Sequence, residues 1–283
     1  MIEVLQVLQG VMERGIIFGV LVIGVYLSSR IIKFDNLSVE GAFGLGGGIT
    51  ALLLNQKINP WIALFVATLG GAFSGVMTGY INRKFEINSL ISGIIITTAL
   101  FSVTLKIAGS NMILQDRQTI FQGLGMIFPD FQYSIILFLV VFFIIMFLKF
   151  FLKTEVGFLL YALGDNPQML LNLGKSINFY TMLGLALSNA TAALAASLYV
   201  QYVGYFSIWA GAGILIIGLA GMILGELLSP YFGFAIIYGS ILYQMIITMT
   251  FEFQINQDWN KLITAVLITV MLLSKKTEIN KLR

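Results

Sequence analysis

Long apolar runs recur along the whole chain and decide what it can fold into. Each run of roughly 18 or more residues is long enough to cross the hydrocarbon core of a bilayer as a helix. Only 10% of the residues are charged, whereas a soluble domain carries about 25%. The segments of about 10 residues with alternating polarity that are typical of a membrane β-barrel are absent. We therefore predict an all-α, polytopic helical membrane protein in which residues 1–283 form a single transmembrane domain.

The breaks between the apolar runs contain charges, Asn, Pro and Gly, which are typical of helix ends. They predict nine spans, or eight or ten if one break is misread. The predicted spans lie near residues 11–29, 37–54, 60–80, 88–106, 133–153, 178–200, 208–228, 231–251 and 260–274.

The distribution of Lys and Arg predicts the orientation, because cytoplasmic loops carry an excess of these residues. With the segment 154–176 in the cytoplasm, most of the 16 basic residues lie inside. The outer ones are Arg14, Lys57, Lys106, Arg117 and Lys261. We therefore expect the N-terminus outside and the C-terminus inside.

Small residues recur at four-residue spacing within several predicted spans. Such faces allow helix backbones to approach closely in lipid. We expect them to be packing surfaces of a compact bundle. The faces are Gly71, Gly75 and Gly79, then Gly184, Ser188, Ala192 and Ala196, and then Gly221 and Gly225.

The segment Thr154–Ser176 is a polar and apolar mixture between two long apolar runs. A connection between helices needs only a few residues, so this segment is long for a simple link. It has an amphipathic pattern and a turn at Gly164-Asp165-Asn166-Pro167, and we expect it to contact a partner outside the membrane. It also contains Gly174-Lys175-Ser176, but a phosphate-binding loop needs a glycine at position 169, which is Met.

Glu40 precedes a run with five glycines in eight residues, which predicts a weakened or broken helix. Broken helices line cavities in many transporters, and a carboxylate at membrane depth is a candidate functional group. The alternative is that Glu40 caps a helix or pairs with Arg30 or Lys33 at the cytoplasmic interface. The predicted substrate pathway comprises Asn36, Ser38, Glu40, Gly41 and Phe43.

The chain has no histidine and no cysteine. Zinc-dependent proteolysis within the membrane therefore has no ligands, and we expect no metal site and no catalytic residue. No serine stands in a recognisable activating context. A secondary transporter would need ionisable groups within the membrane to couple ions to transport, and this chain has few of them. The composition does not exclude a structural membrane scaffold.

The segment 154–176 resembles the cytoplasmic loop of ATP-binding-cassette (ABC) importer permeases of the branched-chain amino acid and ribose type. That loop has a Thr-x-x-Gly start, an Ala-x-Gly-Asp-Asn-Pro core and a later Gly. The N-terminal part, with LSVEGAFGLGG, Thr78-Gly79 and Asn88-Ser-Leu-Ile-Ser-Gly-Ile, is similar to a subgroup linked to tryptophan or tyrosine uptake. The matching loop residues are Thr154, Gly157, Ala162, Gly164, Asp165, Asn166, Pro167 and Gly174.

The resemblance implies a permease subunit in a bacterial plasma (inner) membrane that carries an amino acid, of the aromatic type. A separate ATPase subunit would hydrolyse ATP and dock on the eight matching residues, so this chain would be no enzyme and need no cofactor. An extracytoplasmic substrate-binding protein would deliver the substrate, and two permease copies would pair. The alternatives are an ion-coupled secondary transporter and an ABC permease for a sugar or nucleoside. The apolar face expected in the ATPase groove is Phe158, Leu159, Tyr161 and Leu163.

Overall fold

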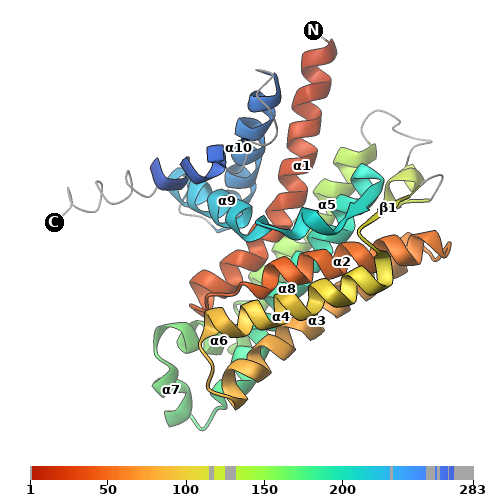
Figure 1. Ribbon diagram of the computed structural model, residues 1–283. Helices are drawn as coiled ribbons and strands as arrows, with labels where there is room; N and C mark the ends of the chain where they lie inside the picture. Colours follow the sequence, from red (N-terminus) through yellow and green to blue (C-terminus); the bar gives the residue numbers. More distant parts are fainter. Residues whose placement is uncertain are drawn as a thin grey trace.

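A computed structural model describes residues 2–114, 118–124, 132–229, 232–252, 259, 262–266 and 268–270. The described part is a bundle of helices with one small two-stranded sheet (Figure 1). The elements are α1 (Ile2–Tyr26), a π-helix η1 (Leu27–Ile31), α2 (Ser38–Asn55), α3 (Pro60–Lys84), α4 (Ser89–Ala108), β1 (Asn111–Ile113), a 3₁₀-helix η2 (Ile120–Leu124), α5 (Gln132–Phe151), α6 (Glu155–Asp165), α7 (Pro167–Asn172), α8 (Ile177–Val203), β2 (Tyr205–Ser207), a 3₁₀-helix η3 (Ile208–Gly211), α9 (Ile214–Leu228) and α10 (Phe232–Glu252).

Within the described residues, six helical segments are long and apolar enough to cross a membrane, which confirms a polytopic helical membrane protein. The predicted spans at 37–54 and 231–251 are helical as α2 and α10, and α10 has a shorter apolar segment, Ala235–Thr250. The predicted ninth span, 260–274, is described only in part, at residues 262–266 and 268–270. The six segments are Gln6–Ile31, Pro60–Lys84, Ser89–Ala108, Tyr133–Phe151, Ile177–Val203 and Ile208–Leu228.

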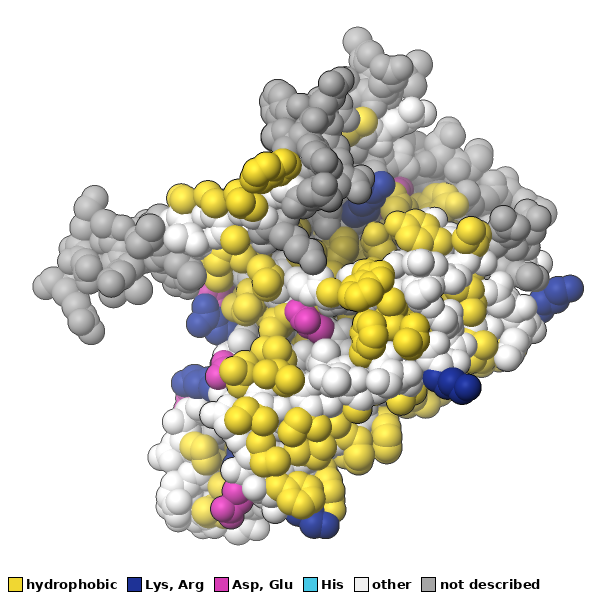
Figure 2. Space-filling view, in the orientation of Figure 1, with side chains coloured by type: hydrophobic (Ala, Val, Ile, Leu, Met, Phe, Trp, Pro, Cys, Tyr) yellow, Lys and Arg dark blue, Asp and Glu magenta, His cyan; other side chains and the backbone are white. Residues whose placement is uncertain are grey.

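Hydrophobic side chains cover much of the face in Figure 2, and most charged side chains lie near its edges. On α4, for example, Ile91, Ile95 and Phe101 are exposed. Exposed aliphatic and aromatic side chains are expected where a surface faces lipid tails, which are as apolar as leucine.

Helix α8 is central, and it packs against α1, α2 and α3. A Cβ at Gly79 of α3 would lie 2.9 Å from the Cα of Met182 in α8, and one at Gly71 or Gly75 would lie even closer to the α8 backbone, against a carbonyl oxygen. Gly184 of α8 approaches Ile32 in the same way. The predicted small-residue faces are therefore confirmed as packing surfaces. They are used within one chain, so they are not free to pair two copies.

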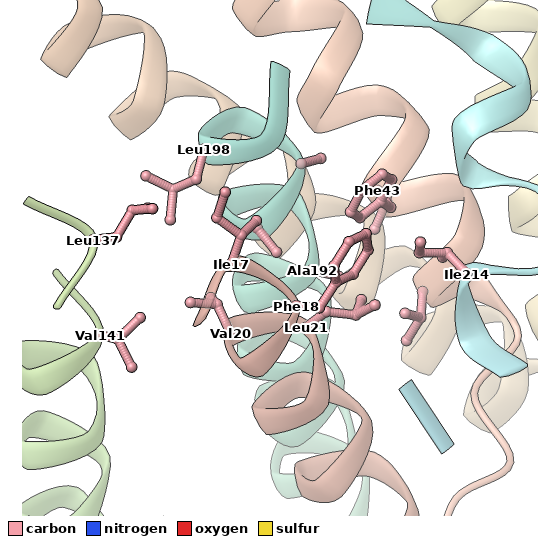
Figure 3. Close-up of a cluster of buried hydrophobic side chains, with 14 of the residues drawn as sticks. Ile17, Phe18, Val20, Leu21, Phe43, Leu137, Val141, Ala192, Leu198 and Ile214 are labelled. Carbon is pink, nitrogen blue, oxygen red and sulfur yellow. The ribbon is translucent and has the colours of Figure 1, made fainter. Parts of the chain in front are cut away.

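The main core lies where α1 meets α2, α5, α8 and α9 (Figure 3). In Figure 3, Ile17 of α1 lies next to Leu198 of α8 and faces Leu137 of α5, whereas Leu21 lies on the side towards Ile214 of α9. Phe43 of α2 and Ile214 of α9 close the opposite side. This core holds the N-terminal half of the chain against α8 and α9.

The glycine-rich run after Glu40 does not break a helix, contrary to the prediction. Helix α2 continues through Gly46 and Gly48 to Asn55. A Cβ at Gly46 would lie 2.5 Å from the carbonyl oxygen of Ala193, and one at Gly48 would lie 2.8 Å from Thr104. The glycines are therefore explained by close helix packing rather than by loss of helical structure.

The interrupted segment is instead Ile208–Leu228, where η3 ends at Gly211 and α9 begins at Ile214. Gly213, with a φ of +82°, forms the junction in a left-handed conformation that favours glycine. Helix α9 has 15 residues, or about 22 Å, which is shorter than the roughly 30 Å hydrocarbon core. The 3₁₀-helix η3 precedes α9 in this segment and follows β2, which pairs antiparallel with β1.

Candidate functional site

The segment 154–176 folds as two short helices, α6 and α7, which project from one end of the bundle (Figure 1). Thr154 caps α6, because its hydroxyl oxygen accepts a hydrogen bond from the Gly157 amide at 3.4 Å. Asn166 caps α7 by accepting from the Gln168 amide at 3.1 Å, and Pro167 occupies the first turn. These residues therefore shape the corner between the two helices. We call α6 and α7 together the α6–α7 platform.

Two glycines hold the platform against the bundle. A Cβ at Gly164 would overlap the Ile31 carbonyl oxygen at the end of η1, and one at Gly157 would overlap the backbone of Leu152. Any larger side chain at either position would therefore push α6 away from the bundle. Gly164 thus places α6 directly on the end of the first transmembrane segment.

The platform buries one face of α6 and exposes the other. Leu159 and Leu163 are 7% and 4% exposed, and they pack in the core cluster that contains η1 and α5 residues. The prediction that they face a partner is therefore wrong, because helical periodicity turns them towards the bundle. Phe158 is 63% exposed. Four other large apolar side chains of the segment are also exposed, and together with Phe158 we call them the outer apolar patch: Tyr161, Met169, Leu171 and Leu173.

The other predicted coupling residues support the shape of the segment. The Ala162 carbonyl accepts a hydrogen bond from the Asn166 amide at 2.8 Å and ends α6. Gly174 has a φ of +69°, and its amide donates to the Leu171 carbonyl at 2.9 Å, which ends α7. Met169 and Leu171 of α7 and Leu173, which follows it, were not predicted as part of the docking surface.

Three ion pairs lie at the same end of the molecule. Lys33 contacts Asp165 at 2.8 Å, and Lys175 contacts Glu155 at 2.9 Å. The hydrogen bond from Lys175 to Glu155 raises the pKa of Lys175. The third pair joins Arg30 of η1 to Glu226 of α9 through two hydrogen bonds of 2.7 Å.

Asn36 and Ser38 belong to a buried polar network between α2, α3 and α8. The Asn36 amide donates to the Asn189 side-chain oxygen at 2.9 Å, and Ser38 donates to the Asn36 oxygen at 2.6 Å. Asn189 donates to Ser38 at 2.9 Å, and Thr78 does so at 2.8 Å. Asn36 is 3% exposed and Ser38 is fully buried. Since buried polar groups are stabilised by such bonds, these two residues are placed to join three helices rather than to reach an open surface.

Glu40 lies at the interruption before α9, and a carboxylate oxygen accepts a hydrogen bond from the Gly213 amide at 3.1 Å. The amino end of a helix stabilises a negative charge, which accounts for this position. Arg30 and Lys33 pair elsewhere, so the structure does not support the predicted alternative of pairing with either residue. Glu40 is half-buried.

The remaining pathway candidates differ in accessibility. Gly41 is packed against Thr97 of α4. Phe43 lines a narrow crevice together with Gly44 and Tyr199, and a Cβ at Gly44 would contact nothing within 4 Å. Of the predicted pathway residues, Glu40 and Phe43 therefore lie nearest to open space.

The fold defines a multi-pass membrane protein with a helical platform at one end and an interrupted segment within the bundle. The chain belongs to the branched-chain amino acid transport system permease component family, whose model matches residues 7–272. The expected resemblance to these permeases is confirmed.

Two relatives extend this assignment. A tyrosine transport system permease protein of Clostridioides difficile (strain R20291) is 34% identical over 268 residues, which are 93% of this chain and 89% of the relative. An uncharacterized protein of Rickettsia prowazekii (strain Madrid E) is 30% identical over 223 residues, or 78% of each chain. No solved structure matches the chain.

Proposed function

We propose that this chain is the membrane-spanning subunit of an ATP-driven importer, forming the pathway for an amino acid with an aromatic side chain. The observation that carries the proposal is the outer apolar patch on the α6–α7 platform. Such a patch at a polar end of a membrane protein is suited to a protein partner. The partner is a separate ATPase subunit that uses ATP, and this chain needs no cofactor of its own.

The charges support a cytoplasmic position for the platform. Lys33 pairs with Asp165 of the platform, and Lys175 pairs with Glu155 of the platform. Arg30 lies on η1, against which α6 packs. Arg83, at the end of α3, donates to Thr181 at the start of α8 with a distance of 3.0 Å. These basic residues gather at the platform end, as the positive-inside rule requires of a cytoplasmic surface. The N-terminus of α1 lies at the opposite end in Figure 1, which favours an outside N-terminus.

The platform contacts the bundle directly, so motion of the platform would be transmitted to the transmembrane helices. Gly164 touches Ile31, and Asp165 pairs with Lys33 on the connection that leads to α2. Two states of the ATPase that differ in their contacts with the outer patch would therefore act on η1 and α2 together. Glu40 follows on α2, next to the interruption before α9. This route connects the partner to the predicted pathway residues.

The substrate class follows from the relatives, one of which is described as a tyrosine transport system permease. In the proposed assembly, two copies of the chain pair in a bacterial plasma membrane. A substrate-binding protein delivers the amino acid to the face opposite the platform. The pairing surface lies away from the small-residue faces, which are already occupied within the chain.

Transport by vesicles tests the proposal. The chain is reconstituted with the ATPase and binding-protein subunits that its host encodes, and uptake of labelled L-tyrosine is measured. We expect uptake that requires ATP and persists when ionophores collapse the ion gradients. Uptake that needs an ion gradient and no ATP would identify a secondary transporter, and competition by a sugar or nucleoside but not by amino acids would change the substrate class.

A further inference from the structure

A cavity of about 670 Å³ opens between α1, α5 and the end of α8, on the side away from the platform. Its size lies within the usual range for a small-molecule site. The main core (Figure 3) forms the floor of the cavity, because three of its residues lie about one helical turn from lining residues. Ile17 follows Glu13 by four positions, Leu137 follows Tyr133 by four, and Leu198 precedes Tyr202 by four. The cavity is lined chiefly by Glu13, Arg14, Tyr133, Tyr199, Tyr202 and Tyr205.

Glu13 is a carboxylate held in place deep in this cavity. It is 5% exposed, and one oxygen accepts hydrogen bonds from Gln9 at 2.9 Å and Ser134 at 2.5 Å. Among the described residues, the other oxygen accepts one bond, from the Tyr202 hydroxyl at 3.0 Å. A carboxylate offers about four acceptor positions, so the second oxygen retains room for one further donor. An ammonium group of a ligand would satisfy that position.

Arg14 supplies the opposite charge at the mouth of the cavity. Its side chain is exposed and lines the cavity together with Tyr202. Among the residues that the structure describes, no carboxylate oxygen lies within 4.0 Å of its guanidinium. The planar guanidinium binds carboxylates in a bidentate manner, so Arg14 is available for one from a ligand.

The tyrosine rings are fixed by neighbouring aromatic rings before any ligand arrives. Tyr133 and Tyr202 meet edge to face, with ring centroids 5.8 Å apart and planes at 90°. Phe121 lies 4.9 Å from Tyr133, and Phe18 lies 5.6 Å from Tyr199. Rings held in this way give up little conformational freedom on binding, and they favour an aromatic guest over an aliphatic one.

We infer that this cavity is a binding site for a free, zwitterionic amino acid with an aromatic side chain. Arg14 binds its carboxylate, Glu13 accepts from its ammonium group, and the tyrosines contact its ring. The site deepens the proposed function and rests on it for its role in transport. It lies on the entry side, so it would receive the amino acid before the pathway opens.

Binding to the full chain alone, in lipid nanodiscs, tests the site without any partner subunit. The probes are labelled L-tyrosine, tyramine, which lacks the carboxylate, and L-leucine, which lacks the ring. We expect the wild type to bind L-tyrosine about tenfold more tightly than tyramine, because one charged contact is lost. Arg14→Gln should bind both equally, and Arg14→Lys should restore part of the difference. Lys57→Gln, at an exposed cation in the turn between α2 and α3, should behave as the wild type.

Each outcome separates the site from the proposed function. Equal binding of L-tyrosine and tyramine by the wild type, an unchanged preference in Arg14→Gln, or binding of L-leucine as tight as that of L-tyrosine overturns the site. If the complete transporter shows ATP-dependent uptake but this chain alone does not bind L-tyrosine, the proposed site is wrong and the proposed function stands. If binding follows the expected order but there is no ATP-dependent uptake, the proposed site stands and the proposed importer function is wrong.

Discussion

The Lys33 ammonium lies 2.8 Å from the Asp165 carboxylate and joins the connection between η1 and α2 to the end of α6. Both side chains are more than half exposed, so the pair contributes only about 0–1 kcal/mol to stability. Its position on the proposed route from platform to pathway gives it a second role, which is to keep the two segments moving together.

Reversing one charge of this pair should uncouple ATP hydrolysis from uptake. In Asp165→Lys the two ammonium groups repel each other, so α6 can move without carrying the connection with it. We expect uptake per ATP hydrolysed to fall several-fold while the thermal unfolding midpoint changes little. The double variant Lys33→Asp/Asp165→Lys should recover most of the coupling. A normal ratio of uptake to hydrolysis in the single variant would show that this contact transmits nothing.

The two faces of α6 should respond differently to the loss of a large apolar side chain. Phe158→Ser removes an exposed ring from the outer patch, and it should weaken ATPase binding in a pull-down with no loss of stability. Leu160 is 1% exposed, so Leu160→Ala should lower the free energy of unfolding by about 2–5 kcal/mol. If Phe158→Ser retains full ATPase binding, the docking surface lies elsewhere.

Neighbouring glycines of α2 provide a matched pair for helix packing. A Cβ at Gly46 meets the Ala193 carbonyl, whereas one at Gly44 meets nothing within 4 Å. We expect Gly46→Ala to destabilise the protein by about 1–3 kcal/mol, and Gly44→Ala to leave its stability unchanged or raise it by up to about 1 kcal/mol. Thermal unfolding in one detergent measures both. Equal effects would mean that α2 and α8 are further apart than described.

Glu40→Gln tests the pathway. The glutamine oxygen can still accept from the Gly213 amide, so the fold should persist, but the negative charge at the interruption is lost. We expect the maximal uptake rate to fall about tenfold, which corresponds to about 1.4 kcal/mol, with ATPase binding unchanged. Glu86→Gln, at an exposed turn between α3 and α4, is the control. Unchanged uptake kinetics would assign Glu40 a purely structural role.

Local features of the α6–α7 platform could be predicted because they depend on near neighbours in sequence. Thr154, Asn166 and Pro167 start helices, and the bonds involved span two or three residues. Which face of α6 is buried and which is exposed could not be predicted from near neighbours. Phe158 and Leu159 are adjacent and both apolar, yet only contact with η1 and α5 decides which of them is buried.

Glu40 illustrates the same limit over a longer distance. The sequence marks it as an unusual carboxylate before a glycine run, and it suggests partners seven and ten residues away. The structure places it against Gly213, which is 173 residues away, and gives the predicted partners other carboxylates. Of the glycines that suggested a broken helix, Gly46 is instead explained by the backbone of α8 and Gly48 by Thr104 of α4.

By itself, the sequence determined the membrane class, the places of most spans and the family, because apolar run length and a local loop motif are properties of consecutive residues. Only the tertiary structure decided which helix is interrupted, which face of α6 is free and how Glu13, Arg14 and four tyrosines meet around one cavity. These depend on contacts between segments far apart in the chain, where close packing of small residues selects one arrangement among many with the same hydrophobic pattern.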